Sequence, residues 1–278
     1  KHGKMSTPNV QLADGNKIPQ IGLGTWKITD QREFNTAFYA AIESGYRHFD
    51  TAQAYDNEQF LGEIWGTTGL KRSQLFITTK IAVEHFGEKR AKKTFAESLT
   101  NLKTDYVDLL LLHFPVTFLR KSSWKALVDI KASGQARSIG VSNYTIRHLK
   151  EMQDYSGVKP VVNQVELHLF LQQPELVKYC NDNDIVVEAY SPLAHGKANE
   201  LKEDTITKIA EKHHKTYAQI MIKWLLEQNM VVIPKSVTRS RIAENINVFD
   251  FKLDKQDMSD LAKLDRDLRT CWSPVHIP

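Results

Sequence analysis

The chain has 278 residues with a formal net charge of +4, and 41% of its residues are hydrophobic and 25% are charged. These ordinary globular proportions predict a large buried core and exclude an intrinsically disordered chain. The densest basic stretch, residues 89–93, has no interleaved aromatic residues, so we expect a solvated helix face there and no nucleic-acid interface.

The N-terminal residues are expected to precede the main fold. Residues 1–4 are interpreted as a remnant of recombinant expression before a natural start at Met5. Residues 1–7 are positively charged but lead into no apolar segment, which excludes an ordinary secretory signal. The pair Asp14-Gly15 favours the positive φ angles of a tight turn and predicts a small β-hairpin.

From residue 21 onward, short apolar runs alternate with helical patterns. The first helix is marked by Asp30 and Glu33 as a capping box and by Gly45 as a stop. Strands are predicted at residues 21–24, 47–50, 75–80, 106–113, 136–142, 161–166, 185–190 and 231–235. Further helices are predicted at residues 92–102, 123–133, 145–155, 174–183 and 216–228, and extra helices at 205–212 and 255–264.

Eight strands rich in Leu, Ile and Val, separated by helices, indicate a parallel sheet covered by helices. An open doubly wound sheet is the alternative, and it normally carries a Gly-x-Gly-x-x-Gly turn after its first strand. Here Gly22 and Gly24 are followed by Thr25-Trp26-Lys27, with no third glycine at the required place. We therefore expect one α/β domain over residues 1–278, a (β/α)8 TIM barrel with an N-terminal hairpin and two extra helices.

Polar residues end three adjacent predicted strands, where a barrel of this type carries its reactive groups. Asp50 ends the second strand and is followed by Tyr55, Lys80 ends the third strand, and His113 ends the fourth. Taken singly, each has a structural explanation, such as an ion pair between Asp50 and Lys80. Taken together they suit carbonyl reduction, because a hydride that reaches a carbonyl carbon leaves an alkoxide that must be stabilised and protonated.

Tyr55 is the predicted proton donor. An unperturbed tyrosine has a pKa of about 10, and a nearby ammonium makes its phenolate easier to form. Lys80 supplies that charge in this hypothesis, and Asp50 holds Lys80 in place. His113 is expected to orient the carbonyl oxygen by hydrogen bonding.

Segments spread over nearly the whole chain resemble the aldo-keto reductases, specifically their short-looped prokaryotic-type members, which include diketogluconate and glyoxal reductases. The matching segments are Gly22-Leu23-Gly24-Thr25-Trp26, residues 45–52, Tyr55 with Asn57-Glu58, Thr79-Lys80, residues 108–113, Gly140-Val141-Ser142-Asn143, Asn163-Gln164-Val165-Glu166, Tyr190-Ser191-Pro192-Leu193 and Ile233-Pro234-Lys235-Ser236. The family's catalytic tetrad falls on the four residues reached above.

The resemblance implies NADPH, bound extended across the barrel mouth, and so accounts for the missing dinucleotide fingerprint. It implies that Ser142, Asn143 and Gln164 hold the nicotinamide amide and that Tyr190 stacks on its ring. Further cofactor contacts implied by position are Thr25, Trp26, Ser191, Leu193, Val237, Glu244 and Asn245.

A phosphate site is predicted after the last strand, in a region where barrels often bind phosphate. Lys235, Ser236, Thr238 and Arg241 lie there, beside the start of a helix that carries Glu244. This arrangement suits the adenosine 2′-phosphate and favours NADPH over NADH. A basic helix start on the surface is the alternative.

Trp26, Phe86, Phe114 and Trp272 are predicted to line the substrate pocket together with His113. The sequence departs from the family pattern here, since Phe114 stands where a tryptophan is frequent and Ile81-Ala82 replaces an aromatic residue. The resemblance therefore implies a wider pocket.

Rival functions remain open from the sequence alone. One alternative is that the chain is a non-catalytic NADPH-binding sensor or partner subunit built on the same barrel, although such a protein has no evident use for the tetrad. A metallohydrolase is disfavoured, since Glu166 and His168 make a weak ligand set and His213-His214, expected to be exposed, do not share a helix face. Two widely separated cysteines predict free thiols in a reducing compartment, and the lack of a long apolar run predicts a cytoplasmic protein with no membrane partner. We also expect a monomer that acts on a small carbonyl substrate and binds no metal and no nucleic acid.

Overall fold

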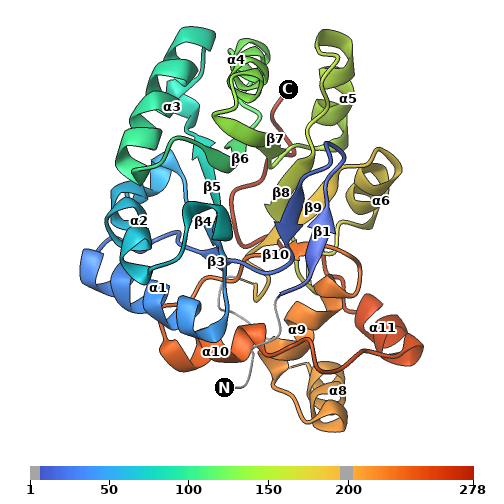
Figure 1. The fold of residues 1–278 in the computed structure, drawn as a ribbon. Coiled ribbons are helices and arrows are strands. Elements are labelled where there is room, and N and C mark those ends of the chain that lie inside the picture. Colours follow the sequence, from blue (N-terminus) through green and yellow to red (C-terminus); the bar gives the residue numbers. More distant parts are fainter. Residues whose placement is uncertain (1–6, 195–202) are drawn as a thin grey trace.

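The computed structural model describes residues 7–194 and 203–278, and residues 1–4 lie outside these ranges. Figure 1 shows the strands gathered in the middle of the molecule with helices arranged around them. The sheet has eight strands that pair in parallel in chain order: β3 (Leu23–Gly24), β4 (His48–Asp50), β5 (Phe76–Ile81), β6 (Val107–Leu112), β7 (Ala136–Ser142), β8 (Val162–Glu166), β9 (Val186–Tyr190) and β10 (Val231–Val232).

The first and last strands of this sheet also meet each other. Parallel bridges join Ile21 to Val232 and Gly24 to Lys235, and the backbone N–H of Gly22 donates to the carbonyl of Val232 at 2.9 Å. These contacts close the sheet, so the predicted barrel is confirmed. β3 and β10 are shorter than predicted because the residues that flank them, Ile21 and Lys235, pair through isolated bridges and not within a regular strand.

The predicted hairpin is present as β1 (Asn9–Gln11) and β2 (Lys17–Pro19), which pair antiparallel. Leu12 and Ile18 are buried in one apolar cluster with residues that begin barrel strands, among them Phe76, Val162 and Val231. The hairpin therefore closes the amino-terminal end of the barrel, and the opposite end remains for a site.

The helices follow the strands as the periodicity predicts. Asp30 caps the first helix by accepting the backbone N–H groups of Arg32 and Glu33, and Gly45 ends it with a φ of 102°. The helices are α1 (Gln31–Ser44), α2 (Glu58–Ile64), α3 (Glu88–Leu102), α4 (Arg120–Ala132), α5 (Ile146–Tyr155), α6 (Pro174–Asp182), α8 (Asp204–His213), α9 (Tyr217–Leu226), α10 (Arg239–Ile246) and α11 (Lys255–Ala262). Helix α2, with seven residues, was too short to be recognised from its periodicity.

The basic stretch 89–93 lies on α3 as expected. Lys89, Arg90 and Lys93 are exposed, whereas Ala91 faces the core. Among the described ranges, no helix combines the length and the apolar character needed to span a bilayer.

Gly22 is needed for close packing inside the barrel. A Cβ atom added there would lie 2.6 Å from the ring of His48, which is fully buried. The imidazole therefore occupies the space that a side chain at position 22, just before β3, would fill. Other buried polar side chains, among them Asp50 and Lys80, lie closer to the carboxyl ends of the strands.

Candidate active site

A cavity of about 820 Å³ opens at the carboxyl end of the barrel strands. Every residue predicted to contact the cofactor lines this one cavity, although these residues come from five separate regions of the chain. They are Thr25, Trp26, Ser142, Asn143, Gln164, Tyr190, Ser191, Leu193, Lys235, Ser236, Val237, Thr238, Arg241, Glu244 and Asn245. The cavity also takes in Asp50, Tyr55, His113, Phe114 and Trp272.

One predicted pocket residue lies elsewhere. Phe86 is 3% exposed and belongs to the hydrophobic core between sheet and helices, so we leave it out of the proposed pocket. Its position after β5 suggested a rim residue, but η4 (Val83–His85) turns the chain and buries the ring. Cys271 and Tyr217 also line the cavity but were not predicted from the sequence. Neither the C-terminal tail around Cys271 nor the start of α9 at Tyr217 carries a sequence pattern that indicates such a position.

Lys80 is the central residue of the predicted tetrad. It lies on β5 and is fully buried, and its ammonium donates to Asp50 Oδ1 at 2.6 Å, to the carbonyl of Thr51 at 2.9 Å and to the hydroxyl of Tyr55 at 3.1 Å. The other oxygen of Asp50 accepts the amide of Gln164 at 2.8 Å. Asp50 therefore ties the catalytic end of β4 to both β5 and β8.

Tyr55 is carried by the short turn η1 (Gln53–Tyr55) rather than by a strand. The side chain of Gln53 fixes this turn, since its Oε1 accepts the backbone N–H of Ala82 at 2.9 Å and lies 2.8 Å from His85 Nδ1. The ring of Tyr55 then lies 5.8 Å from that of His113 in an edge-on arrangement. The phenol and the imidazole thus face the same end of the cavity.

The electrostatics of this cluster differ in one respect from the sequence-based expectation. Burial raises the pKa of Tyr55, and the Lys80 charge, which acts to lower it, does not fully offset that effect. Burial acts to lower the pKa of Lys80, but Asp50 and Tyr55 outweigh it and raise that pKa above its ordinary value. Tyr55 is therefore protonated at neutral pH, the state that a proton donor needs.

His113 is uncharged at neutral pH. Burial and, to a smaller extent, the Lys80 charge lower the pKa of His113 to about 3. A neutral imidazole can donate a hydrogen bond to a carbonyl oxygen without adding a second proton source.

The amide-rich end of the cavity is held by hydrogen bonds between β7, β8 and β9. Ser142 Oγ donates to the backbone carbonyl of Gln164 at 2.8 Å, and Asn143 Nδ2 donates to the carbonyl of His113 at 3.1 Å. The hydroxyl of Tyr190 donates to Asn143 Oδ1. This rigid set of amides beside an aromatic ring fits a nicotinamide, which carries one amide on a flat ring.

The other end of the cavity is basic. Lys235 and Arg241 are exposed, and among residues 7–194 and 203–278 neither has an ion-pair partner. They lie beside the start of α10, whose N-cap is Thr238. Cations next to free backbone N–H groups suit a phosphate, so the lining fits an extended NADPH from end to end.

The histidines outside the tetrad do not gather into a metal site. The expectation that His213 and His214 are exposed is correct for His214 only, because His213 is half-buried with Nε2 2.8 Å from Asp257 Oδ2. His168 and Glu166 contact each other at 2.9 Å. No group of three or more possible ligands is found in the described part of the chain.

Glu188 lies on β9 inside the barrel, and its carboxyl group is fully buried. Neither of its oxygens has a hydrogen-bond partner within the described residues, and His48 Nε2 lies 3.7 Å from Oε1. Burial, and then the Asp50 charge, raise the pKa of Glu188 to about 8. The folded protein therefore retains a proton here that the unfolded chain releases, and the stability that this proton brings is lost as the pH rises through about 8.

Glu188→Gln is expected to remove this pH dependence, since the amide cannot ionise. The free energy of unfolding of the wild type should fall by at least about 1 kcal/mol between roughly pH 6 and pH 8.5, and that of the variant should fall less. Chemical denaturation at both pH values measures the difference. Parallel curves for the two proteins would show that Glu188 does not titrate in this range.

The chain is similar to known proteins along nearly its whole length. A model described as "Aldo/keto reductase family" matches residues 20–266. A methylglyoxal reductase of Escherichia coli O157:H7 is 43% identical over 95% of this chain and 96% of its own length, and a glyoxal reductase of Bacillus subtilis is 41% identical over 95% of each.

Solved structures agree with these sequence relatives. An aldo-keto reductase from a Medee basin deep-sea metagenome library superposes with a TM-score of 0.93 at 38% identity, covering 98% of this chain and 100% of that one. A Bombyx mori aldo-keto reductase in complex with NADP superposes with a TM-score of 0.89 at 32% identity, covering 96% and 95%. The chain belongs to the aldo/keto reductase family.

Proposed function

We propose that this chain uses NADPH to reduce small 2-oxoaldehydes and related dicarbonyl compounds to alcohols, with Tyr55 as the proton donor. The observation that carries the proposal is the Lys80 ammonium 3.1 Å from the Tyr55 hydroxyl, at the end of a cavity whose other end is basic. The relatives named methylglyoxal reductase and glyoxal reductase support this substrate class.

NADPH, when bound, supplies a hydride to the carbonyl carbon. The π electrons of the carbonyl move to its oxygen, and the proton of Tyr55 completes the alcohol. The Lys80 ammonium stabilises the phenolate that remains, and Asp50 keeps that ammonium in place. His113 orients the carbonyl oxygen, which brings the reacting carbon to one defined position.

The direct test follows NADPH absorbance while the purified protein is supplied with methylglyoxal, glyoxal, simple aldehydes and keto sugars. The proposal expects turnover, with the dicarbonyl compounds reduced most efficiently. The alternative, a non-catalytic sensor, expects NADPH binding without turnover of any carbonyl compound.

Arg241→Ala is expected to weaken NADPH binding by on the order of tenfold while changing NADH binding little. The reason is that the guanidinium would contact only the 2′-phosphate, which NADH lacks. Fluorescence titration with each nucleotide measures the two dissociation constants. Arg239→Ala is the matched control, because Arg239 lies on the same helix but pairs with Glu43. If Arg241→Ala weakened the binding of NADPH and NADH equally, the 2′-phosphate would have to bind elsewhere.

We further propose that the chain works as a single-domain monomer in the cytoplasm, without nucleic acid. The dispersed positive charge and the free thiols of Cys180 and Cys271 support this proposal.

A further inference from the structure

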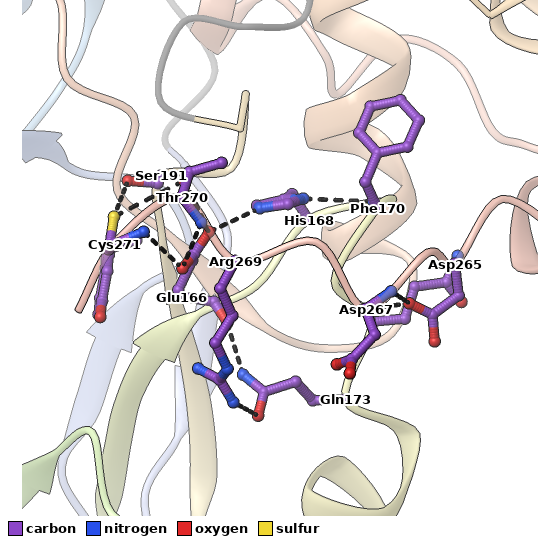
Figure 2. A network of polar contacts seen from close by, with 12 residues as sticks. Glu166, His168, Phe170, Gln173, Ser191, Asp265, Asp267, Arg269, Thr270 and Cys271 are labelled. Carbon is purple, nitrogen blue, oxygen red and sulfur yellow. Dashed lines mark hydrogen bonds and ion pairs between the residues drawn. The ribbon is translucent and has the colours of Figure 1, made fainter. Parts of the chain in front are cut away.

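Residues that follow α11 are tied to the loop after β8 by a network of polar contacts (Figure 2). At its centre lies Glu166, the last residue of β8, whose side chain is buried. Its Oε1 accepts the backbone N–H of Cys271 at 3.0 Å, and its Oε2 accepts the backbone N–H and the hydroxyl of Thr270 at 2.9 and 2.7 Å. One carboxylate thus holds two consecutive residues of the C-terminal tail.

His168 orients this carboxylate. Its Nδ1 accepts the backbone N–H of Phe170 at 3.2 Å, so the ring proton lies on Nε2, which donates to Glu166 Oε2 at 2.9 Å. Burial acts to raise the pKa of Glu166, but the hydrogen bonds from His168, Thr270 and Cys271 outweigh it and hold that pKa below its ordinary value. Glu166 is therefore a carboxylate whose contacts with described residues are all to hydrogen-bond donors.

A second connection runs in parallel from the same residue. The backbone carbonyl of Glu166 accepts the side-chain amide of Gln173 at 2.7 Å, and Gln173 Oε1 accepts Arg269 Nη2 at 3.2 Å. The backbone N–H of Leu268 also donates to the carbonyl of Phe170 at 2.9 Å. Figure 2 shows the contact between Gln173 and Arg269 close to the contacts that Glu166 makes with Thr270 and Cys271.

Trp272 follows directly and forms a wall of the cavity. Its ring lies 4.0 Å from the ring of Phe114 at an angle of 37°, although 58% of its surface is exposed. Further along the tail, the carbonyl of Ile277 lies 2.8 Å from His148 Nε2 on α5, where Figure 1 shows the chain ending beside α4 and α5. Trp272 is thus carried on a segment held at both ends.

We propose that Glu166, oriented by His168, is a positioning residue that sets substrate preference by holding Trp272 against Phe114. The aromatic pair then contacts the substituent of the carbonyl substrate and favours aromatic substituents, whereas a methyl group gains little from it. The identity of the substrates rests on the proposed function, but the link from Glu166 to Trp272 does not.

Glu166→Gln tests the link with almost no change in shape. One oxygen of the carboxylate becomes an NH₂ group, which donates hydrogen bonds and cannot accept them. It therefore faces at least one N–H group as a second donor, and the hydrogen bond to Thr270 or Cys271 is lost. The ratio of kcat/KM for phenylglyoxal to that for methylglyoxal should fall about fivefold or more, chiefly through KM. The dissociation constant of NADPH should stay within about twofold of the wild-type value.

Matched variants separate positioning from general destabilisation. Thr270→Val removes only the hydroxyl bond and should lower the same ratio by a smaller factor, whereas Thr270→Ser should leave it unchanged. Asp257→Asn alters another buried carboxylate, which anchors Lys212 and His213 away from the cavity, and should lower the melting temperature without changing the ratio. Should Glu166→Gln fail to fold, the Thr270 pair still tests the proposal.

A double-mutant cycle with Trp272→Ala then decides how Glu166 acts. In that background Glu166→Gln should cause no further change in the substrate ratio, because the wall is already gone. An additive effect, or an equal loss for both substrates, would overturn the proposal.

Acrylamide quenching of Trp272 emission gives a measurement that needs no turnover. The emission of Trp272 is obtained by subtracting that of a Trp272→Phe protein with the same second substitution. It should be quenched more strongly in Glu166→Gln than in the wild type, and equal quenching would overturn the link. If the wild type reduces no dicarbonyl compound, the proposed function fails while this measurement still tests the anchor.

Discussion

Tyr55→Phe is expected to abolish most turnover while leaving the protein folded and able to bind NADPH. The substitution removes one hydroxyl, which accepts a single hydrogen bond from Lys80, and preserves the ring that faces His113. Loss of a general acid typically costs about 10²-fold to 10⁴-fold in rate, so kcat should fall by at least about 100-fold. Steady-state kinetics with methylglyoxal and NADPH titration by fluorescence measure the two quantities.

One control variant makes this result specific. Tyr190→Phe also removes a hydroxyl from the cavity, but one that donates to Asn143, and it should retain much more activity. A Tyr55→Phe protein with wild-type kcat would remove Tyr55 from the proposed chemistry and leave the cavity as a binding site.

Lys80→Met is expected to affect both activity and stability. Methionine has a similar length but no charge, so the carboxylate of Asp50 stays buried and, among the described residues, keeps the Gln164 amide as its one side-chain partner. Breaking a buried ion pair by removing one partner typically costs about 3 to 5 kcal/mol of folding free energy. Turnover should also fall by at least about 100-fold, because the phenolate of Tyr55 loses its stabilising charge.

The double variant Asp50→Asn with Lys80→Met separates these two effects. Neutralising the stranded carboxylate should recover much of the stability, as measured by chemical denaturation, but none of the turnover. Recovery of turnover together with stability would mean that Lys80 contributes only to folding.

The location of the tetrad could be predicted because strand ends meet in a parallel barrel. Asp50, Lys80 and His113 lie far apart in the chain, yet each follows an apolar strand, and the fold brings all such positions to one end. The structure confirms that they meet, with 2.6 Å between Lys80 and Asp50. The roles assigned to the lining residues stay predictions until the variants are measured.

The protonation of Tyr55 could not be predicted in the same way. A neighbouring ammonium and burial act on the pKa of the phenol in opposite directions, and their balance depends on how completely the surrounding chain excludes water. The sequence identified the ammonium, whereas the extent of burial came only from the packed barrel. Phe86 illustrates the same limit, since one turn of chain decides between the cavity rim and the core.

By itself the sequence determined the strand order, most of the helices and the barrel, because periodicity, caps and strand ends are properties of neighbouring residues. It also predicted that Asp50, Lys80 and His113 meet at one end of the barrel, whereas most of the predicted cofactor contacts came from the resemblance to a family. The tertiary structure alone decided that Glu166, which looked like half of a weak metal site, holds Thr270, a residue 104 positions away. Spacing along the chain carries no record of such a contact. Hydrogen bonds between distant segments form only where folding brings a buried acceptor against donors that water can no longer satisfy.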